Sequence, residues 1–555
     1  MESEAGVPVE AEEASLAEYD AVNSDSISQD SSSSSGYGGA EEESDSEPQQ
    51  DPYSGLDSDI PHRTYHYEKA PLLTLLMVHI NWAILIVFGY LRDLLLHMGL
   101  ERNVLAQESE KHRDFVPLYK KFDSLFIKHI FRRLRDCFSR SVCSVPGTEM
   151  WIKDRVTNDY CWTFQYTGTK SKILNMGSYN YLGFAQNSGP CTDSAVKAID
   201  QYGIGACSSI TEYGNSKIHR QLEQTIAEFL GTEAALCYPM GFGTNTMNIP
   251  SIIGKGSLVL SDELNHASLI LGCRISGATV KVFKHNDVHD LERKLVHAMR
   301  GDPVTKQPYT KILIIAEGLF SMEGTISHLA DIVALKKKFK AYLFLDEAHS
   351  IGSIGRTGRG VVQYWGCKPD DVDILMGTFT KSFSAAGGYI AGKQKLIDHL
   401  RTCGQACYGP TISPPVAMQI ITATRILMGK DGSKNEGIRR IRMLHRNTRY
   451  FRRRLKQAGF LVYGNVDSPI VPCLLYYPSK VSYFSRELLK RKIGVVIVGF
   501  PATPIGTERA RFCLSSGHTK ETLDTALEAI VEIGDEIGAR YFKKRNNLGN
   551  EPIVY

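Results

Sequence analysis

The sequence lacks the features that define several protein classes. Its twelve cysteines are spread over 555 residues without a C-x-x-C pair, so neither a disulfide framework nor a zinc site is expected. Cys403 and Cys407 lie nearest together, but the neighbouring sequence does not supply the two further ligands of a tetrahedral site. The formal net charge is only +3, which argues against a nucleic-acid binder. The length predicts two packed domains with appendages, and the scattered cysteines predict a reducing compartment.

The first 60 residues have no basic residue at all. They hold 17 of the 61 Asp and Glu residues and none of the 64 Lys and Arg residues. Low apolar content and high net charge predict that residues 1–60 form a disordered acidic tail. A cleaved signal peptide needs a basic start and an apolar run, and a mitochondrial presequence is poor in acids. Both are therefore excluded.

One long stretch, residues 71–91, has no formal charge over 21 residues. As a helix it would extend about 32 Å, which matches a bilayer core. His79 and Asn81 lie near its middle and weaken this interpretation, because polar groups in lipid need partners. We predict a membrane-spanning or membrane-embedded helix within residues 61–100, with an in-plane amphipathic helix and a buried core helix as alternatives. Lys and Arg are denser after Leu91, which favours a cytoplasmic catalytic body.

Residues 101–169 are predicted to form a basic amphipathic linker and an N-terminal arm. Residues 111–140 contain nine Lys and Arg against three Asp. Apolar residues recur every four positions, at Phe122, Phe126, Ile130, Leu134 and Phe138. This spacing predicts a helical stripe flanked by cations. The helix would either lie on an anionic membrane surface or pack on its own domain.

From residue 170 onward, short apolar runs alternate with amphipathic segments. Runs of strand length occupy residues 258–260, 312–315, 342–345 and 372–376. Residues 222–230 and 329–340 have helical patterns, the second of the length that a crossover between parallel strands requires. We predict an α/β large domain with a mostly parallel sheet over residues 170–395. Longer helical patterns at 447–458 and 522–537, with apolar runs at 470–475 and 493–498, predict a smaller α+β domain over residues 396–540 and a tail over 541–555.

Candidate chemical groups follow two neighbouring strands. Asp346 and His349 come directly after residues 342–345, and Lys381 follows residues 374–380. Carboxyl ends of parallel strands share one edge of the sheet. An aldehyde cofactor of the pyridoxal type needs a lysine amine and a carboxylate that keeps its ring nitrogen protonated. Taken singly, such an aspartate is more often a helix cap and such a lysine a solvated cation.

A family resemblance unites these residues. Residues 377–388, GTFTKSFSAAGG, resemble the cofactor-lysine motif of the α-oxoamine synthases, pyridoxal-phosphate enzymes that condense an amino acid with an acyl-CoA. Residues 346–350, 261–268 and 177–183 resemble further motifs of the family in the same order. The resemblance covers residues 170–535 and implies the fold type I, aspartate-aminotransferase-like architecture of pyridoxal-phosphate-dependent transferases.

The resemblance narrows to the catalytic, long-chain-base-2-type subunits of the serine palmitoyltransferases, through residues 241–250 and 499–504 and the apolar segment ahead of them. It implies condensation of L-serine with a long-chain acyl-CoA to 3-oxosphinganine, the first step of sphingolipid biosynthesis. It also implies an endoplasmic reticulum membrane location, a heterodimer with a companion subunit that lacks the cofactor lysine, and small regulatory membrane subunits. Two alternatives stay open: another α-oxoamine synthase, of the 5-aminolevulinate synthase or glycine C-acetyltransferase type, and a noncatalytic scaffold subunit.

The resemblance also implies roles for individual residues. Lys381 would bind the cofactor covalently and move protons at the substrate α-carbon, Asp346 would pair with the ring nitrogen, and His266 would stack on the ring. The remaining implied contacts are His349 with the phenolic oxygen, Thr378, Thr380, Gly241 and Phe242 with the phosphate side, and Arg511 and Asn180 with the substrate. Arg509 lies on the same strand face as Arg511 and could be confused with it.

Two positions depart from the family pattern. Ile210 stands where an arginine is usual, so a charge and five hydrogen-bond donors are lost. Ser384 stands where glycine is usual, three residues after Lys381, and would be strained if its backbone needs a positive φ. These departures bear on catalytic rate and acyl-chain preference more than on the reaction class.

Overall fold

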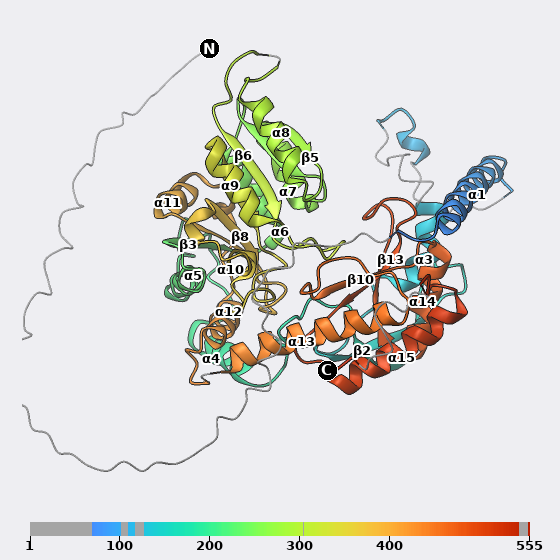
Figure 1. Cartoon of the computed structure of the whole chain (residues 1–555). Helices are drawn as coiled ribbons and strands as arrows, with labels where there is room; N and C mark the ends of the chain where they lie inside the picture. Colours follow the sequence, from blue (N-terminus) through green and yellow to red (C-terminus); the bar gives the residue numbers. More distant parts are fainter. Residues whose placement is uncertain (1–68, 101–108, 117–126, 304, 434, 543–552) are drawn as a thin grey trace, which may run out of the picture. The chain divides into compact units, whose positions relative to one another are not determined.

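A computed structural model of the chain describes residues 69–100, 109–116, 127–303, 305–433, 435–542 and 553–555 (Figure 1). The predicted acidic tail, residues 1–60, lies outside these ranges. So do Phe122 and Phe126 of the predicted basic stripe and most of the predicted C-terminal tail.

A seven-stranded sheet in the order β3-β9-β8-β7-β6-β4-β5 forms the centre of the large domain. Its strands are parallel except for β9, which pairs antiparallel with β3 and β8. The bounds are β3 (Ala234–Tyr238), β4 (Leu258–Asp262), β5 (Thr279–Phe283), β6 (Ile312–Glu317), β7 (Tyr342–Asp346), β8 (Ile374–Thr378) and β9 (Gly388–Gly392). The mostly parallel sheet and its four predicted strands are confirmed.

Helices cover both faces of this sheet. They are α4 (Pro190–Tyr202), α5 (Lys217–Leu230), α6 (Gly241–Ile252), α7 (Ala267–Ser276), α8 (Val288–Ala298), α9 (Leu329–Phe339), α10 (Gly360–Tyr364), α11 (Gln394–Cys403) and α12 (Pro414–Leu427). Leu343 and Leu345 belong to one buried cluster and Phe344 to another. Because side chains alternate along a strand, the two clusters mark the two covered faces, which explains the continuous apolar runs in the sequence.

The C-terminal part contains two three-stranded sheets, β1-β2-β11 and β10-β13-β12. Their strands and the flanking helices are β1 (Glu149–Val156), β2 (Gln165–Asn175), β10 (Ile470–Leu474), β11 (Ile493–Gly494), β12 (Val496–Val498), β13 (Arg509–Cys513), α13 (Glu436–Gln457), α14 (Pro478–Lys490) and α15 (Lys520–Glu536). The predicted run 493–498 is divided between the two sheets. β1 lies in the range expected as linker and arm, and β2 joins it to β11, so the N-terminal arm completes the C-terminal part.

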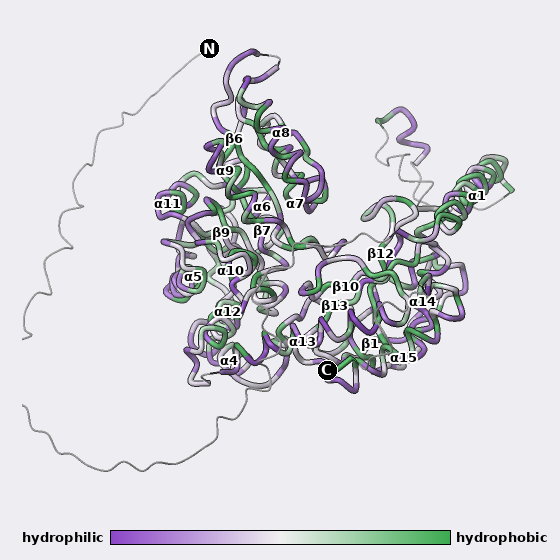
Figure 2. The backbone as a smooth tube through the Cα atoms, viewed as in Figure 1, coloured by the Kyte–Doolittle hydropathy of each residue, from purple (hydrophilic) through white to green (hydrophobic). Residues whose placement is uncertain are grey.

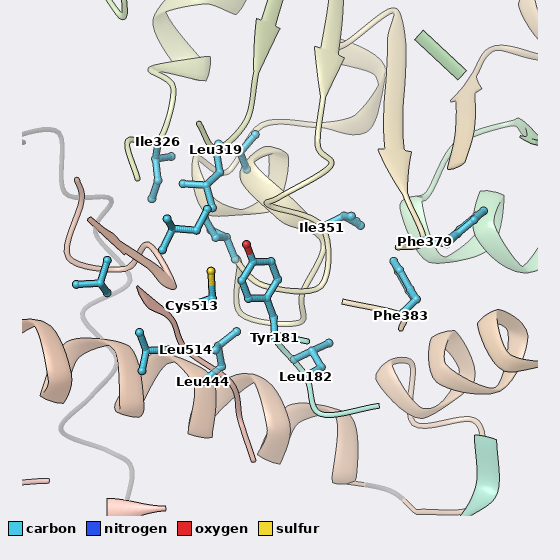
Figure 3. Close-up of a cluster of buried hydrophobic side chains, with 14 of the residues drawn as sticks. Tyr181, Leu182, Leu319, Ile326, Ile351, Phe379, Phe383, Leu444, Cys513 and Leu514 are labelled. Atoms are coloured by element: carbon cyan, nitrogen blue, oxygen red, sulfur yellow. The ribbon is translucent and has the colours of Figure 1, made fainter. Parts of the chain in front are cut away.

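A large buried apolar cluster connects the large domain with the C-terminal part. Figure 3 shows Tyr181 and Cys513 of this cluster among Leu319, Ile351 and Leu444. These side chains come from loops that follow β6 and β7, from α13 and from the end of β13. The packing holds β13 beside the carboxyl edge of the seven-stranded sheet.

Helix α1 (Leu72–His97) is long and apolar enough to cross a membrane. One face packs on the protein, because Val78 and Trp82 are only 1% and 5% exposed and belong to a cluster with Ile130 and Leu474. Other faces expose large apolar side chains such as Leu73, and Figure 2 shows the helix as hydrophobic over most of its length. An exposed apolar surface of this length suggests membrane anchoring.

The predicted basic helix is not continuous in its described part. A π turn, η2 (Ile127–Phe131), is followed by α3 (Arg132–Leu134) and by a 3₁₀ turn, η3 (Arg135–Cys137). Phe138 is then extended, with φ −110° and ψ 164°. The spacing of the apolar residues predicted one regular helix. The structure instead has consecutive π, α and 3₁₀ turns, which differ in the number of residues per turn. Ile130 packs in the cluster with Leu474, so this part packs on its own domain.

Candidate active site

The predicted acid, histidine and lysine meet at the carboxyl edge of the sheet. Asp346 ends β7 and is buried, and its carboxylate accepts hydrogen bonds from Asn245 Nδ2 at 2.9 Å and from the Ala348 amide at 2.8 Å. His349 follows in the next loop, where its Nδ1 is hydrogen-bonded to the Tyr181 hydroxyl at 2.9 Å. Burial and the nearby Lys381 cation lower the pKa of His349 well below its usual range. A neutral imidazole therefore faces this edge.

Lys381 follows β8 in the same site. Burial lowers the pKa of its amine to about 8, although Asp346 and Glu317 act in the opposite direction. Within the described residues, no side chain hydrogen-bonds or ion-pairs with this amine, and the Tyr179 ring centre lies 5.7 Å from Nζ. The lowered pKa and the lack of a competing partner among the described residues make Lys381 available as a nucleophile.

His266 is the N-cap residue of α7. Its Nδ1 accepts a hydrogen bond from the Ser268 amide at 3.2 Å, so the neutral tautomer carries its proton on Nε2. Burial lowers the pKa of His266, which favours that neutral form. The Ser268 hydroxyl lies 2.8 Å from the same Nδ1 and accepts from Asn245 at 3.0 Å. Asn245 thus links His266, through Ser268, to Asp346.

Sequence reasoning missed this network. Asn245 lies within residues 241–250 and Ser268 within residues 261–268, two segments that carry the family resemblance, but the sequence offered no reason to assign a role to either residue. Glu317 was also missed: it ends β6 opposite Asp346, and its carboxylate accepts from the His266 amide at 2.5 Å. Burial, with the adjacent Asp346, raises the pKa of Glu317 well above its usual range. The only signal in the sequence was that Asn245 is a polar residue inside a motif. Its partners Ser268 and Asp346 lie 23 and 101 residues further along the chain, so only the fold reveals them.

A narrow cradle lies between α6 and the loop after β8. Gly241 begins α6, and a Cβ there would lie 2.7 Å from Thr378 Oγ1. The Thr378 and Thr380 hydroxyls are 2.9 Å apart, and Thr378 also donates to the Gly387 carbonyl at 2.9 Å. The half-exposed Phe242 stands beside them, with its ring 6.0 Å from His266. A helix N-terminus with two hydroxyls is suited to a phosphate.

The chemistry of these groups fits pyridoxal phosphate. Lys381 offers an amine for an aldehyde, Asp346 offers an acceptor for a ring N–H, and the Gly241 cradle offers donors to a phosphate. The cradle has room because Gly241 has no side chain.

Arg511 and Arg509 have separate partners. The Arg511 guanidinium lies 4.8 Å from the Tyr179 ring centre and, in the described part of the chain, its buried Nε has no hydrogen-bond partner. Arg509 ion-pairs with Glu323 at 3.4 Å. Arg511 lies over the same Tyr179 ring as Lys381, and its buried Nε offers a donor to an anionic ligand, whereas Arg509 is engaged by Glu323.

Asn180 lies at the margin of the site. Its Oδ1 accepts a hydrogen bond from the Ser384 hydroxyl at 2.9 Å, and its Nδ2 donates to the Pro146 carbonyl at 3.3 Å. Ser384 has φ +51°, so the departure from glycine does fall on a left-handed backbone. Ile210 is 3% exposed in an apolar cluster with Leu236, so that position now contributes to the core.

An apolar cavity of about 320 Å³ extends from the site. Tyr179, Met322 and Arg511 line it on the catalytic side, and Trp82 of α1 also lines it. Further lining residues are Ile130, Phe131, Leu134, Phe138, Pro478, Val481, Val496, Ile497, Val498, Gly499, Phe500, Pro501, Ala502 and Glu508. Tyr179, whose ring lies beside Lys381, places this apolar enclosure next to the catalytic edge.

Comparison with known proteins defines the class first. Residues 171–530 match the family model for aminotransferase class I and II. Among solved structures, a serine palmitoyltransferase from S. paucimobilis with bound PLP and myriocin is similar with a TM-score of 0.66 and 28% identity, covering 76% of this chain and 100% of that one. A Sphingomonas wittichii serine palmitoyltransferase gives a TM-score of 0.65 and 27% identity, covering 78% and 99%. The fold is therefore that of the class I and II aminotransferases.

Curated relatives narrow the family. Serine palmitoyltransferase 2 of Caenorhabditis elegans is 50% identical over 491 residues, which cover 88% of each chain. Serine palmitoyltransferase 3 of Homo sapiens is 49% identical over 492 residues, covering 88% of this chain and 89% of that one. The chain belongs to the serine palmitoyltransferase family.

Proposed function

We propose that this chain is the catalytic subunit of a serine palmitoyltransferase. It binds pyridoxal phosphate and condenses L-serine with palmitoyl-CoA to 3-oxosphinganine, with release of CoA and CO2. The observation that carries the proposal is the position of Lys381: a buried amine with a pKa of about 8 lies near Asp346 and Arg511, and Arg511 lines the apolar cavity. The family membership supports the same reaction.

The cofactor, when bound, supplies an electron sink for the electrons left at the substrate α-carbon. Lys381 would hold the cofactor through its amine and would carry protons to and from that carbon. Asp346 would pair with the ring nitrogen, and Asn245 fixes the Asp346 carboxylate with its 2.9 Å hydrogen bond. Neutral His266, oriented by Ser268, would pack against the ring, because an uncharged imidazole avoids repulsion with a cationic ring.

The remaining cofactor contacts follow from the cradle. Thr378, Thr380 and the start of α6 at Gly241 and Phe242 would hold the phosphate, whose charge suits the helix N-terminus. His349, with its ring fixed by Tyr181, would reach the phenolic oxygen. These contacts would orient the ring in addition to Lys381.

Substrate groups are assigned by charge and polarity. Arg511 binds the serine carboxylate with its planar guanidinium, which matches a carboxylate in two hydrogen bonds. Asn180, held by Ser384, lies at the substrate side of the site. The apolar cavity takes the acyl chain, because most of its lining residues are apolar and only Glu508 and Arg511 among them are charged. A long acyl chain uses this enclosure, whereas the short acyl groups of the 5-aminolevulinate synthase and glycine C-acetyltransferase types do not.

The cellular setting completes the proposal. Helix α1 anchors the chain in the endoplasmic reticulum membrane, with the catalytic body in the cytoplasm, because the basic residues follow the apolar stretch. The chain pairs with a companion subunit that lacks the cofactor lysine and with small regulatory membrane subunits. Domain limits at residues 395 and 540 separate the cofactor-binding and C-terminal domains, and β1 and β2 are added to the latter.

Mass spectrometry of long-chain bases tests the function. Membranes that contain this chain with its companion should convert labelled serine and palmitoyl-CoA to 3-oxosphinganine, and Lys381→Ala should abolish both the product and the visible cofactor absorption. Lys395→Ala, at an exposed position on α11, is the matched control and should retain both. Incorporation of glycine without serine would favour another α-oxoamine synthase, and a colourless wild type would favour the scaffold subunit.

A further inference from the structure

The loop between β6 and α9, residues 318–328, folds as a tight hairpin beside the catalytic edge. The Phe320 amide donates to the Thr325 carbonyl at 2.9 Å, and the Gly324 amide donates to the Phe320 carbonyl at the same distance. Gly324 has a φ of +67°, a left-handed conformation that favours glycine. Met322 therefore lies at the tip of this hairpin, between Phe320 and Thr325.

Buried polar contacts fix the base of the hairpin. The fully buried Thr325 hydroxyl lies 2.7 Å from His285 Nε2, and His285 Nδ1 lies 2.9 Å from a carboxylate oxygen of Asp262, the last residue of β4. The Ile326 amide donates to Asn465 Oδ1 at 2.8 Å. Buried polar groups with satisfied hydrogen bonds make a segment rigid. The hairpin is therefore a firm support for the side chain at its tip.

The backbone and the side chain of Met322 each contact an arginine of β13. Its carbonyl accepts a hydrogen bond from Arg509 Nη1 at 2.9 Å, and its sulfur accepts from Arg511 Nη1 at 3.7 Å. Arg511 and Lys381 lie over the same Tyr179 ring, at 4.8 and 5.7 Å from its centre. Met322, Arg511 and Tyr179 also line the apolar cavity. The half-buried Met322 side chain thus lies where this cavity approaches the catalytic edge.

A thioether suits this position. Sulfur is a weak hydrogen-bond acceptor, so it orients the Arg511 guanidinium without forming an ion pair with it. A carboxylate forms charge-assisted hydrogen bonds that are roughly twice as strong, so it would displace the sulfur from Nη1. The methionine side chain is also apolar and adaptable, and it fills irregular space beside a ligand. Met322 can therefore orient Arg511 and at the same time present apolar surface to the cavity.

Given the proposed condensation of serine with an acyl-CoA, we propose that Met322 is a specificity-determining residue that limits the space around the first carbons of the acyl chain. The carboxylate that Arg511 binds is bonded to the α-carbon that attacks the thioester, so these acyl carbons must pass close to Arg511. Its neighbour in the cavity lining is Met322. A straight acyl chain passes beside the methionine, whereas a methyl branch at acyl carbon 2 requires the volume that the methionine fills.

Paired acyl donors test this role in the full chain with its companion subunit. Equal concentrations of palmitoyl-CoA and 2-methylpalmitoyl-CoA are supplied with serine, and mass spectrometry gives the ratio of the two products. We expect wild type to prefer the straight donor and Met322→Ala to reduce this preference about tenfold, the size that one methylene in an apolar pocket accounts for. Met322→Leu keeps the volume and should stay within about threefold of wild type.

The matched control is Met299→Ala, which removes the same atoms at an exposed position outside the lining of the apolar cavity. Its product ratio should stay within about twofold of wild type. All three variants should keep the visible cofactor absorption, which excludes misfolding as the cause of a changed ratio.

Serine binding separates the role of the sulfur from that of the volume. The serine concentration that half-saturates the change in cofactor absorption should rise about twofold to threefold in both Met322→Ala and Met322→Leu, because both remove a weak acceptor from Arg511. An unchanged product ratio in Met322→Ala, or an equal change in Met322→Leu, would overturn the assignment while wild type still consumes palmitoyl-CoA. Wild type that forms neither product would contradict the proposed function together with this role.

Discussion

The apolar cavity and a second, basic cavity, whose lining includes Arg92, Arg132, Arg133 and Arg486, lie on two sides of one short segment, residues 130–134, and have opposite chemistry. Ile130, Phe131 and Leu134 line the apolar cavity, whereas Arg132 and Arg133 line the basic one. Successive residues of a helical turn point in different directions, so five residues can serve two environments. The comparison teaches that the N-terminal arm contributes to the walls of the molecule's cavities: one side of residues 130–134 lines the apolar cavity and another side lines the basic one.

The largest effect should come from filling the apolar cavity. Ala502 lines it on the segment after β12 and is exposed enough to accept a larger side chain. We expect Ala502→Phe to lower kcat/KM for palmitoyl-CoA by about tenfold relative to decanoyl-CoA, because one or two displaced methylenes account for a change of that size. Competition assays with paired acyl-CoAs measure the ratio.

The matched control is Ile505→Phe, which adds bulk on the same segment at an exposed position that does not line the cavity. Its acyl preference should stay within about twofold of wild type. An equal shift of acyl preference in the two variants would show that bulk on this segment, and not filling of the apolar cavity, changes the preference, and it would break the comparison.

The sequence predicted the catalytic edge better than either cavity. Asp346 and Lys381 each end a continuous apolar run, and parallel topology places such ends together without knowledge of side-chain contacts. Asn245 carried no such signal. Its role depends on a turn of α6 that brings one amide within 3.0 Å of both Ser268 and Asp346.

Long-range pairing limited the rest. The run 493–498 is one apolar segment in sequence, yet Ile493 pairs with Leu174 and Val496 with Arg511 in different sheets. A period-two pattern does not reveal which partner each strand finds. The regular helix predicted from the basic stripe was also wrong in its described part. The π turn at Ile127–Phe131 shifts the helical register, and the helix ends before Phe138. Arg92, Arg133 and Arg486 likewise converge only in the folded chain.

A smaller effect should arise from pH. Glu508 lines the apolar cavity, and burial raises the pKa of its carboxyl to about 7. A neutral carboxyl is less costly than a carboxylate beside an apolar acyl chain. The affinity for palmitoyl-CoA should therefore be highest below this pKa and fall as Glu508 ionises. We expect KM for palmitoyl-CoA to rise about threefold to fivefold between pH 6 and 8, given the cost of ionising a group against apolar surface.

Glu508→Gln removes the titrating group at nearly constant shape. Its KM for palmitoyl-CoA should not change between pH 6 and 8 when serine is kept saturating at each pH. Any titration of Lys381 is common to both proteins and therefore cancels in the comparison. A pH profile of KM identical to wild type would show that Glu508 does not contact the acyl chain. The acyl chain would then not occupy the part of the cavity that Glu508 lines.

The smallest effect should come from Ser384, which touches neither cavity. Its φ of +51° disfavours a side chain, but its hydroxyl holds Asn180 Oδ1 at 2.9 Å. Ser384→Gly relieves about 1 kcal/mol of strain, and it loses a hydrogen bond of about 1 kcal/mol while the unfolded chain gains freedom. The free energy of unfolding should therefore change by less than about 1 kcal/mol in calorimetry, while KM for serine rises about twofold to threefold because Asn180 is less fixed. Ser384→Ala keeps the strain and loses the bond, so it should raise KM equally but lower stability. An unchanged KM in both would limit the role of Ser384 to the loop, and Asn180 would then be oriented by the Pro146 carbonyl and by the Ala185 amide, which donates to Asn180 Oδ1 at 3.3 Å.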